Sequence, residues 1–169
     1  SMDASVFFQS NLSLLSTLVD RVRFHAEKGD WLIDLFSGVG FFASLLEDRF
    51  SRITTVEREP GCLRHAKKNL EKKAEQVTAN AESWLLENTK STPAVLIVDP
   101  PRTGLPPEAL KVIAEGKIKK MIYVSCNPVT LARDLFQLKN SGFEVKAVEG
   151  FAFYPHTPHL EMLLVLDRG

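Results

Sequence analysis

Cys126 and Glu161 are the residues of this chain whose surroundings best suit covalent and acid–base chemistry. Cys126 stands directly before Asn127 and Pro128, which predict a helix start because asparagine caps helices and proline is tolerated in their first turn. The unpaired N–H groups and the dipole of such a helix favour a thiolate, the nucleophilic form of cysteine. Glu161 precedes the apolar run 162–166, so partial burial is expected to raise its pKa into the range of a general base.

Each assignment has an alternative in which the residue is structural. Cys126 could be a small buried hydrophobic residue, which is the interpretation we favour for Cys62 inside a predicted helix. Glu161 could be a solubilising charge at a strand edge. His156 and His159 are rival bases, although each could equally be a turn residue bonded to the backbone.

A glycine-rich turn predicts a cofactor site in the first half of the chain. Gly38-Val39-Gly40-Phe41-Phe42-Ala43 has the Gly-x-Gly-x-x-Gly/Ala spacing between a predicted strand and a helix, where glycines let a ligand approach the backbone. Glu57 ends the next predicted strand, in the region about 20 positions on where such sites carry the acidic residue for the ribose hydroxyls. The same carboxylate suits a dinucleotide or an adenosyl ligand without a pyrophosphate. A charge exposed at a strand end is the structural alternative.

Further polar residues follow other predicted strands at their carboxyl ends, which is the edge where open α/β sheets bind ligands. Asp34 and Asn80 are two of them, although Asn80 could simply cap the next helix. The motif Asp99-Pro100-Pro101-Arg102 ends the fourth predicted strand, and its prolines fix backbone angles that hold Asp99 and Arg102 against the crevice. Phe36 and Phe41 flank the glycines and could pack on an adenine or in the core.

Alternating strands and helices position these residues. After an amphipathic helix over 11–27, the pattern predicts strands at 31–36, 52–57, 76–79, 94–99 and 119–125, with helices after the glycine turn, from Pro60, around 82–87, from Pro106 or Pro107, and from Pro128. Two more strands, 143–149 and 160–166, have no crossover helix between them, so they are antiparallel. The fold class is therefore α/β: a Rossmann-like, seven-stranded, mostly parallel doubly wound sheet with an antiparallel last strand.

Length and composition narrow the possible classes of protein. The length of 169 residues predicts one domain, 1–169. The 21 Lys+Arg residues balance the 21 Asp+Glu residues, so the chain lacks the excess of positive charge that a free-standing nucleic-acid binder usually has. No apolar run approaches the roughly 20 residues of a membrane span, and there is no secretory signal, so we expect a cytoplasmic protein. We further expect a monomer. Two cysteines without Cys-x-x-Cys spacing predict neither a disulfide framework nor a metal site.

In its motifs the sequence resembles the S-adenosylmethionine-dependent RNA uracil-5-methyltransferases, which act on transfer and ribosomal RNA. The resemblance covers essentially the whole chain, and the order and spacing of the motifs make it specific. They are Phe8-Gln9-Ser10-Asn11, Asp34-Leu35-Phe36-Ser37-Gly38-Val39-Gly40, Val56-Glu57, Asp99-Pro100-Pro101-Arg102, Ser125-Cys126-Asn127-Pro128, Leu131-Ala132-Arg133-Asp134 and Phe153-Tyr154-Pro155-His156-Thr157-Pro158-His159-Leu160-Glu161.

The resemblance implies a class I methyltransferase fold, S-adenosyl-L-methionine as cofactor and uridine in structured RNA as substrate. It implies that Cys126 is the nucleophile that adds to carbon 6 of uracil and Glu161 the general base. The implied cofactor contacts are Gln9, Phe36, Gly38, Gly40, Phe41, Glu57, Asn80 and Asp99. The implied uracil contacts are Gln9, Asp99 and Arg102. At Phe41 some members of the family carry a polar contact to the cofactor, so a hydrogen bond is absent or replaced there.

Members of this family normally carry RNA-binding segments ahead of the catalytic domain, commonly a small β-barrel, and some bind an iron–sulfur cluster. We therefore expect the chain to be a catalytic fragment whose main grip on RNA lies elsewhere, which fits its zero net charge. Three other functions stay open. An RNA cytosine-5 methyltransferase normally has a second cysteine beside the fourth-strand proline, an NAD-dependent oxidoreductase would not explain Cys126-Asn127-Pro128, and a non-catalytic RNA-binding module would not need the site residues.

Overall fold

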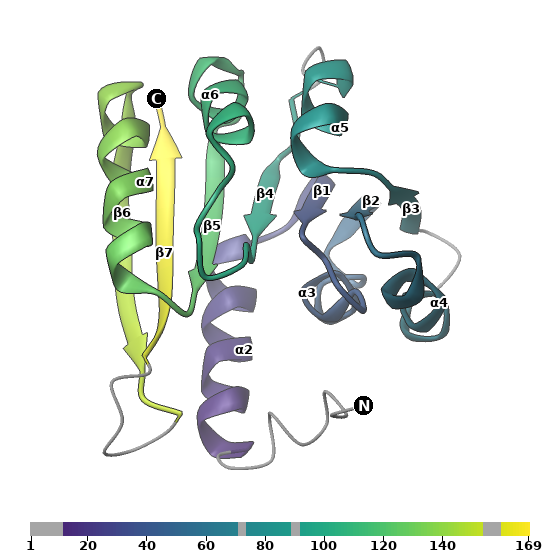
Figure 1. The fold of residues 1–169 in the computed structure, drawn as a ribbon. Coiled ribbons are helices and arrows are strands. Elements are labelled where there is room, and N and C mark those ends of the chain that lie inside the picture. Colours follow the sequence, from purple (N-terminus) through teal and green to yellow (C-terminus); the bar gives the residue numbers. More distant parts are fainter. Residues whose placement is uncertain (1–11, 71–73, 89–91, 154–159) are drawn as a thin grey trace.

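One mixed β-sheet forms the centre of the protein, seen in a computed structural model that describes residues 12–70, 74–88, 92–153 and 160–169 (Figure 1). In these residues seven strands pair in the order β3-β2-β1-β4-β5-β7-β6. Their bounds are β1 (Gly29–Leu35), β2 (Phe50–Glu57), β3 (Ala74–Thr78), β4 (Val95–Val98), β5 (Lys120–Ser125), β6 (Phe143–Phe151) and β7 (Glu161–Arg168). Strands β1 to β5 are parallel, and β7 lies antiparallel between β5 and β6. The predicted fold class is confirmed.

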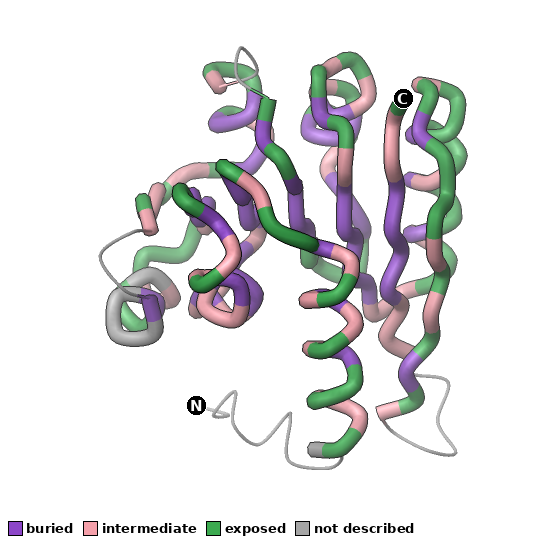
Figure 2. The backbone as a smooth tube through the Cα atoms, turned by 180° about the vertical axis from the view of Figure 1, so that it is seen from behind, coloured by how far each residue is buried: buried purple, intermediate pink, exposed green. Residues whose placement is uncertain are grey.

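Helices cover both faces of the sheet. They are α2 (Leu12–Ala26), α3 (Phe41–Leu45), α4 (Pro60–Asn69), α5 (Ala81–Asn88), α6 (Pro107–Glu115) and α7 (Pro128–Asn140). One core cluster joins the sheet to α5, α6 and α7, and a second joins the opposite face to α2, α3 and α4. The central strands are therefore covered on both faces, and Figure 2 shows them buried along much of their length.

This double burial explains the near-continuous apolar runs of the central strands. All four residues of β4 are buried, and so are the last five of β1. Along β1 the side chains alternate between the two cores, with Leu32 on the side of α2 and Ile33 on the side of α5. Burial at Asp34 is the exception, because it places a carboxyl group in an apolar layer.

Prolines and one asparagine set the starts of three helices as predicted. Pro60, Pro107 and Pro128 stand in the first turns of α4, α6 and α7, where a missing N–H costs nothing. Asn127 caps α7, because its side-chain oxygen accepts a hydrogen bond of 3.1 Å from the N–H of Val129. In the described part of the chain, no helix has the length and apolarity that a membrane crossing requires.

Candidate active site

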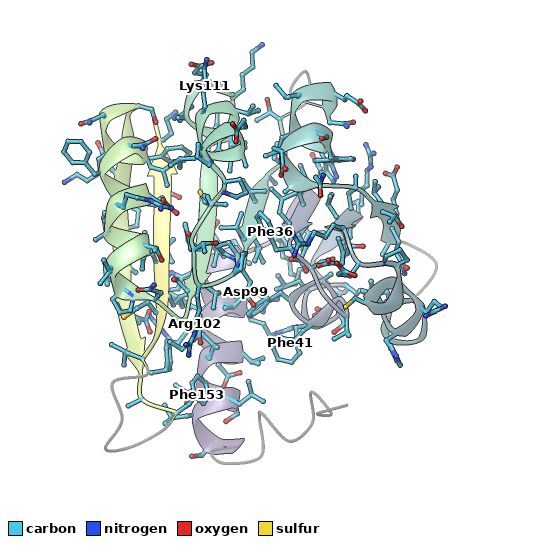
Figure 3. The ribbon with its side chains drawn as sticks, viewed as in Figure 1. Phe36, Phe41, Asp99, Arg102, Lys111 and Phe153 are labelled. Carbon is cyan, nitrogen blue, oxygen red and sulfur yellow. The ribbon has the colours of Figure 1, made fainter. Side chains whose placement is uncertain are left out.

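The predicted site residues gather at the carboxyl ends of the parallel strands. Figure 3 shows Phe36, Asp99, Arg102 and Phe41 near this edge of the sheet, whereas Lys111 on α6 lies toward the opposite end. The strand order reverses at β1, which has β2 on one side and β4 on the other. The N–H of Asp99 donates to the carbonyl of Leu35 at 3.4 Å, so the ends of β1 and β4 meet. Ligands of open α/β sheets bind at such a switch point.

The turn after β1 contains three residues in the left-handed region. Their φ angles are 60° at Phe36, 52° at Gly38 and 74° at Gly40. A Cβ added to Gly38 would meet nothing within 4 Å, whereas one added to Gly40 would lie 2.9 Å from Cδ1 of Leu70 in the chain segment after α4. The two glycines therefore differ in their surroundings, because Gly38 borders open space and Gly40 allows close packing against Leu70. Phe36 is a non-glycine residue in a costly conformation, which is typical of functional turns.

Glu57 is fixed beside this turn by two backbone hydrogen bonds. One of its carboxylate oxygens accepts from Gly38 N at 3.0 Å and the other from Glu59 N at 2.9 Å. Each oxygen keeps a second lone pair, so the carboxylate can still accept from ribose hydroxyls. The sequence left open that Glu57 is simply an exposed charge at a strand end. In the structure its carboxylate is held in a defined orientation.

Two phenylalanines and one asparagine are the remaining predicted cofactor contacts near the ends of β1 to β3. Asn80 is exposed and follows β3, and its carbonyl accepts from Trp84 N at 3.1 Å where α5 begins. Phe36 is half-buried against the core cluster of α5 to α7, and Phe41 against the cluster of α2 to α4. Both phenylalanines therefore belong to the rims of the cores, and each keeps part of its ring accessible.

Asp34 brings a buried carboxyl group under the glycine turn. Its Oδ2 accepts from Ala43 N at 3.0 Å, whereas its Oδ1 is buried without a hydrogen-bond partner. Burial raises the pKa of Asp34 to about 8, with a further upward contribution from the charges of Asp99 and Glu57. The buried hydroxyl of Ser37 also has no partner. Sequence reasoning assigned no role to Ser37, whose position inside the glycine turn was the available signal.

The pairing of β5 with β7 brings the predicted nucleophile and base to one edge. Ser125 is paired with Met162 in antiparallel register, so Cys126, which follows Ser125, and Glu161, which precedes Met162, lie on the same side of this pair. Cys126 is a half-buried free thiol, and Glu161 is half-buried as well. Burial, and after it the charge of Asp99, raises the pKa of Glu161 to about 7, as expected of a base near neutral pH.

Asp99 follows β4, which lies between β1 with its glycine turn and β5 with Cys126 at its end. It is exposed to solvent, yet partial desolvation by the surrounding protein raises its pKa to about 7. Among the described residues, none of the ion pairs involves Asp34, Asp99 or Glu161. Three carboxyl groups whose pKa values are raised, without a cationic side chain to neutralise them, make this edge suited to a cationic ligand.

Four residues that the sequence analysis considered lie apart from this arrangement. Cys62, which the sequence placed as a structural residue, is half-buried in α4, and burial together with the charges of Glu57 and Glu59 raises the pKa of its thiol. These effects oppose a nucleophilic thiolate at Cys62. Gln9, His156 and His159 lie outside the described residues.

Comparison with known proteins agrees with this geometry. A family model described as tRNA (Uracil-5-)-methyltransferase matches residues 86–169. A curated relative named an uncharacterized RNA methyltransferase, from Thermotoga maritima, is 34% identical over 171 residues, which cover 98% of this chain and 39% of the relative. A second of that description, from Bacteroides thetaiotaomicron, is 34% identical over 170 residues, covering 95% of this chain and 37% of the relative. The chain thus spans less than half the length of these relatives.

Two solved structures of RNA methyltransferases have the same fold as this chain. The tRNA (uracil-54, C5)-methyltransferase of Pyrococcus abyssi, in complex with S-adenosyl-L-homocysteine, has a TM-score of 0.76 and 30% identity, covering 89% of this chain and 37% of that one. An rRNA methylase from Streptococcus thermophilus has a TM-score of 0.70 over 91% of this chain and 95% of its own, and its 11% identity speaks for the fold alone. Residues 86–169 thus match the tRNA (Uracil-5-)-methyltransferase model, and nearly the whole chain is similar in sequence and fold to S-adenosylmethionine-dependent RNA methyltransferases.

Proposed function

We propose that this chain transfers a methyl group from S-adenosyl-L-methionine to carbon 5 of a uridine in RNA, through a covalent bond between Cys126 and carbon 6 of the base. The observation that carries the proposal is the antiparallel pairing of β5 with β7, which supports Cys126 and Glu161 at one edge beside Asp99. A nucleophile and a raised-pKa carboxyl group at adjacent strand ends are the two groups that this chemistry requires.

The residues of the β1 and β2 ends fit an adenosyl cofactor that carries positive charge. Glu57 offers carboxylate oxygens to ribose hydroxyls, and Gly38 leaves room for close approach of the ligand. The unpartnered oxygens of Asp34 and Ser37 suit a cationic or hydrogen-bonding group. When bound, S-adenosyl-L-methionine would supply an electrophilic methyl group, and breaking its bond between sulfur and that methyl group would leave S-adenosyl-L-homocysteine. Phe36, Phe41, Gly40, Asn80 and Asp99 complete the proposed cofactor contacts, with Gln9 from outside the described residues.

Cys126 activates the pyrimidine because carbon 5 of uracil is a weak nucleophile by itself. The thiolate adds to carbon 6, and the electron pair moves into an enolate whose carbon 5 can accept the methyl group. Glu161 then takes the remaining proton from carbon 5, the double bond re-forms, and the bond between carbon 6 and sulfur breaks to release the Cys126 thiolate. A carboxyl group with a pKa of about 7 is a stronger base than an ordinary glutamate and is still partly ionised at neutral pH.

Asp99 and Arg102 orient the edge of the uracil, together with Gln9. Their loop lies next to the Cys126 strand end, since β4 and β5 are adjacent in the sheet. The target base must leave its RNA stack to reach this edge. The zero net charge of the chain supports the view that it is a single catalytic domain, 1–169, with the main RNA contacts in other segments of a longer protein. We propose a monomer that acts on rRNA or tRNA in the cytoplasm.

The test uses RNA that contains 5-fluorouridine, because fluorine at carbon 5 cannot leave as a proton. The wild-type chain should form a covalent methylated complex on this RNA, and Cys126→Ala should form none. On ordinary uridine RNA, Glu161→Gln should accumulate the methylated complex that the wild type releases. Lys111→Ala, which changes an exposed residue far from the site, is the matched control and should behave as wild type.

Two outcomes would contradict the proposal. Undiminished turnover by Cys126→Ala would exclude the covalent route, and methylation of cytidine in the mapped product would favour the cytosine-5 alternative. Calorimetry distinguishes the oxidoreductase alternative, because the chain should bind S-adenosylhomocysteine and not NAD. An RNA-binding module would retain RNA affinity without methyl transfer.

A further inference from the structure

The first turns of α7 hold the loop that carries Asp99 and Arg102. The carbonyl of Arg102 accepts a hydrogen bond of 2.9 Å from Asn127 Nδ2 and one of 3.1 Å from Thr130 Oγ1, whose proton is shared with the carbonyl of Asn127 at 3.2 Å. One turn further on, Arg133 Nη2 donates to the carbonyl of Thr103 at 3.0 Å. The backbone of the loop is thus tied to the helix that begins immediately after Cys126.

Asp134 forms the buried centre of these contacts. Its Oδ2 accepts from Tyr123 Oη at 2.7 Å and from Leu105 N at 2.8 Å. Its Oδ1 accepts from Arg133 Nε at 2.8 Å and from Arg133 Nη2 at 2.7 Å. Asp134 has no solvent exposure, and a buried carboxylate is tolerated only when its oxygens are satisfied in this way. The bond from Leu105 N therefore ties the end of the loop to a carboxylate that three further bonds, from Tyr123 and Arg133, hold in place.

Gly104 shows how closely the loop passes over this group. Its φ is +79°, and a Cβ there would lie 2.6 Å from Arg133 Nη2 and 2.7 Å from Asp134 Oδ2. Only glycine allows both the backbone conformation and the contact. The sequence Leu131-Ala132-Arg133-Asp134 thus has a structural use that lies outside the catalytic steps, because its last two side chains meet the loop.

We propose that Thr130 and Asp134 are positioning residues for methyl transfer. They fix the loop 99–105 relative to the end of β5, so that a uracil held by Asp99 and Arg102 presents carbon 6 to Cys126. The inference rests on the proposed function. A reaction that requires two groups on separate loops is sensitive to displacements of about 1 Å between them, so loosening these bonds should slow the reaction itself.

The experiment measures the rate of adduct formation on 5-fluorouridine RNA under single-turnover conditions. Thr130→Val removes the hydroxyl while keeping the shape, and should lower this rate about tenfold, the effect of one lost hydrogen bond. Thr130→Ser keeps the hydroxyl and should restore the rate. Asp134→Asn weakens the pairing with Arg133 and should lower the rate about 100-fold. Phe136→Ala, on the same helix and 69% exposed, is the matched control and should leave the rate unchanged.

A second readout separates positioning from general damage. Affinity for S-adenosylhomocysteine should change by less than about threefold in Thr130→Val, because Asp99 is the one proposed cofactor contact within the loop, whereas Glu57, Gly38 and the other proposed contacts lie outside it. An adduct rate equal to wild type in folded Thr130→Val and Asp134→Asn would overturn the inference and leave the proposed function intact.

A wild-type chain that forms no adduct would instead refute the proposed function. Hydrogen exchange at the Leu105 amide then decides whether α7 holds the loop. This amide should exchange about tenfold faster in Asp134→Asn than in wild type, since its acceptor is weakened, and equal exchange rates would overturn the contact network as a restraint.

Discussion

Replacing Asp34 with asparagine should make the ligand-free protein more stable at pH 8 and have little effect at pH 5. The folded-state pKa of Asp34 is about 8 against an ordinary value of 3.8, because its burial disfavours the charge. The folded state therefore keeps a proton that the unfolded chain has lost above about pH 4, and the stability linked to that proton falls as the pH rises from about 4 to 8. Asparagine is neutral throughout and cannot lose this stability.

The size of the effect follows from the shift. About four pKa units at 1.36 kcal/mol each give a ceiling of about 6 kcal/mol between low and high pH. Asparagine keeps an oxygen for the Ala43 N–H, but its amide group is left without a partner at the position of Oδ1, which costs about 1–3 kcal/mol. At pH 8 the variant should therefore gain about 3–5 kcal/mol. At pH 5, little more than one unit above the ordinary value of 3.8, wild type has lost only about 2 kcal/mol, and the cost of the unpaired amide group offsets this loss, so the two proteins should differ by about 1 kcal/mol or less.

Thermal unfolding followed by circular dichroism at pH 5 and pH 8 measures this difference. A gain of 3–5 kcal/mol corresponds to a rise of about 10 °C in Tm for a domain of this length. Asp30→Asn is the matched control, because Asp30 is exposed near the start of the same strand, at the opposite end from Asp34. Parallel pH dependence of wild type and Asp34→Asn would refute the reasoning, since Asp34 would then ionise equally in the folded and unfolded states.

Two further predictions concern the base and the glycine turn. Turnover on uridine RNA should rise as the pH increases through about 7, because Glu161 must lose its proton to act, and a turnover that is flat from pH 6 to 8 would count against that role. Gly40→Ala should destabilise the fold by about 2 kcal/mol, measured by urea unfolding, since a Cβ there adds a contact of 2.9 Å with Leu70 to the cost of a positive φ. Gly38→Ala, with open space around it, should cost about 1 kcal/mol and mainly weaken S-adenosylhomocysteine binding; equal destabilisation by both would contradict the different uses of the two glycines.

The features that the sequence predicted correctly depend on local chemistry. Pro107 and Pro128 fix helix starts by their own geometry, and the short connection before Glu161 forces an antiparallel strand. The position of β7 between β5 and β6 could not be predicted, because it depends on pairing between residues far apart in the chain. Neither could the different uses of Gly38 and Gly40, which depend on the packing of Leu70 against the turn. The Asp134 contacts are also long-range, and an Arg-Asp pair on a helix gives no sign of them.

The two halves of the site are supported in opposite ways. On the β1 side, Asp34 is buried with one unpaired oxygen and a raised pKa, so this half gains stability when a cationic ligand arrives. On the β5 side, Asp134 is equally buried but fully paired, so this half is rigid before any ligand binds. The contrast suits a two-substrate reaction. In the proposed reaction, affinity for the charged cofactor would come from groups that the free protein leaves unsatisfied, whereas the alignment of the base with Cys126 would require groups that do not move.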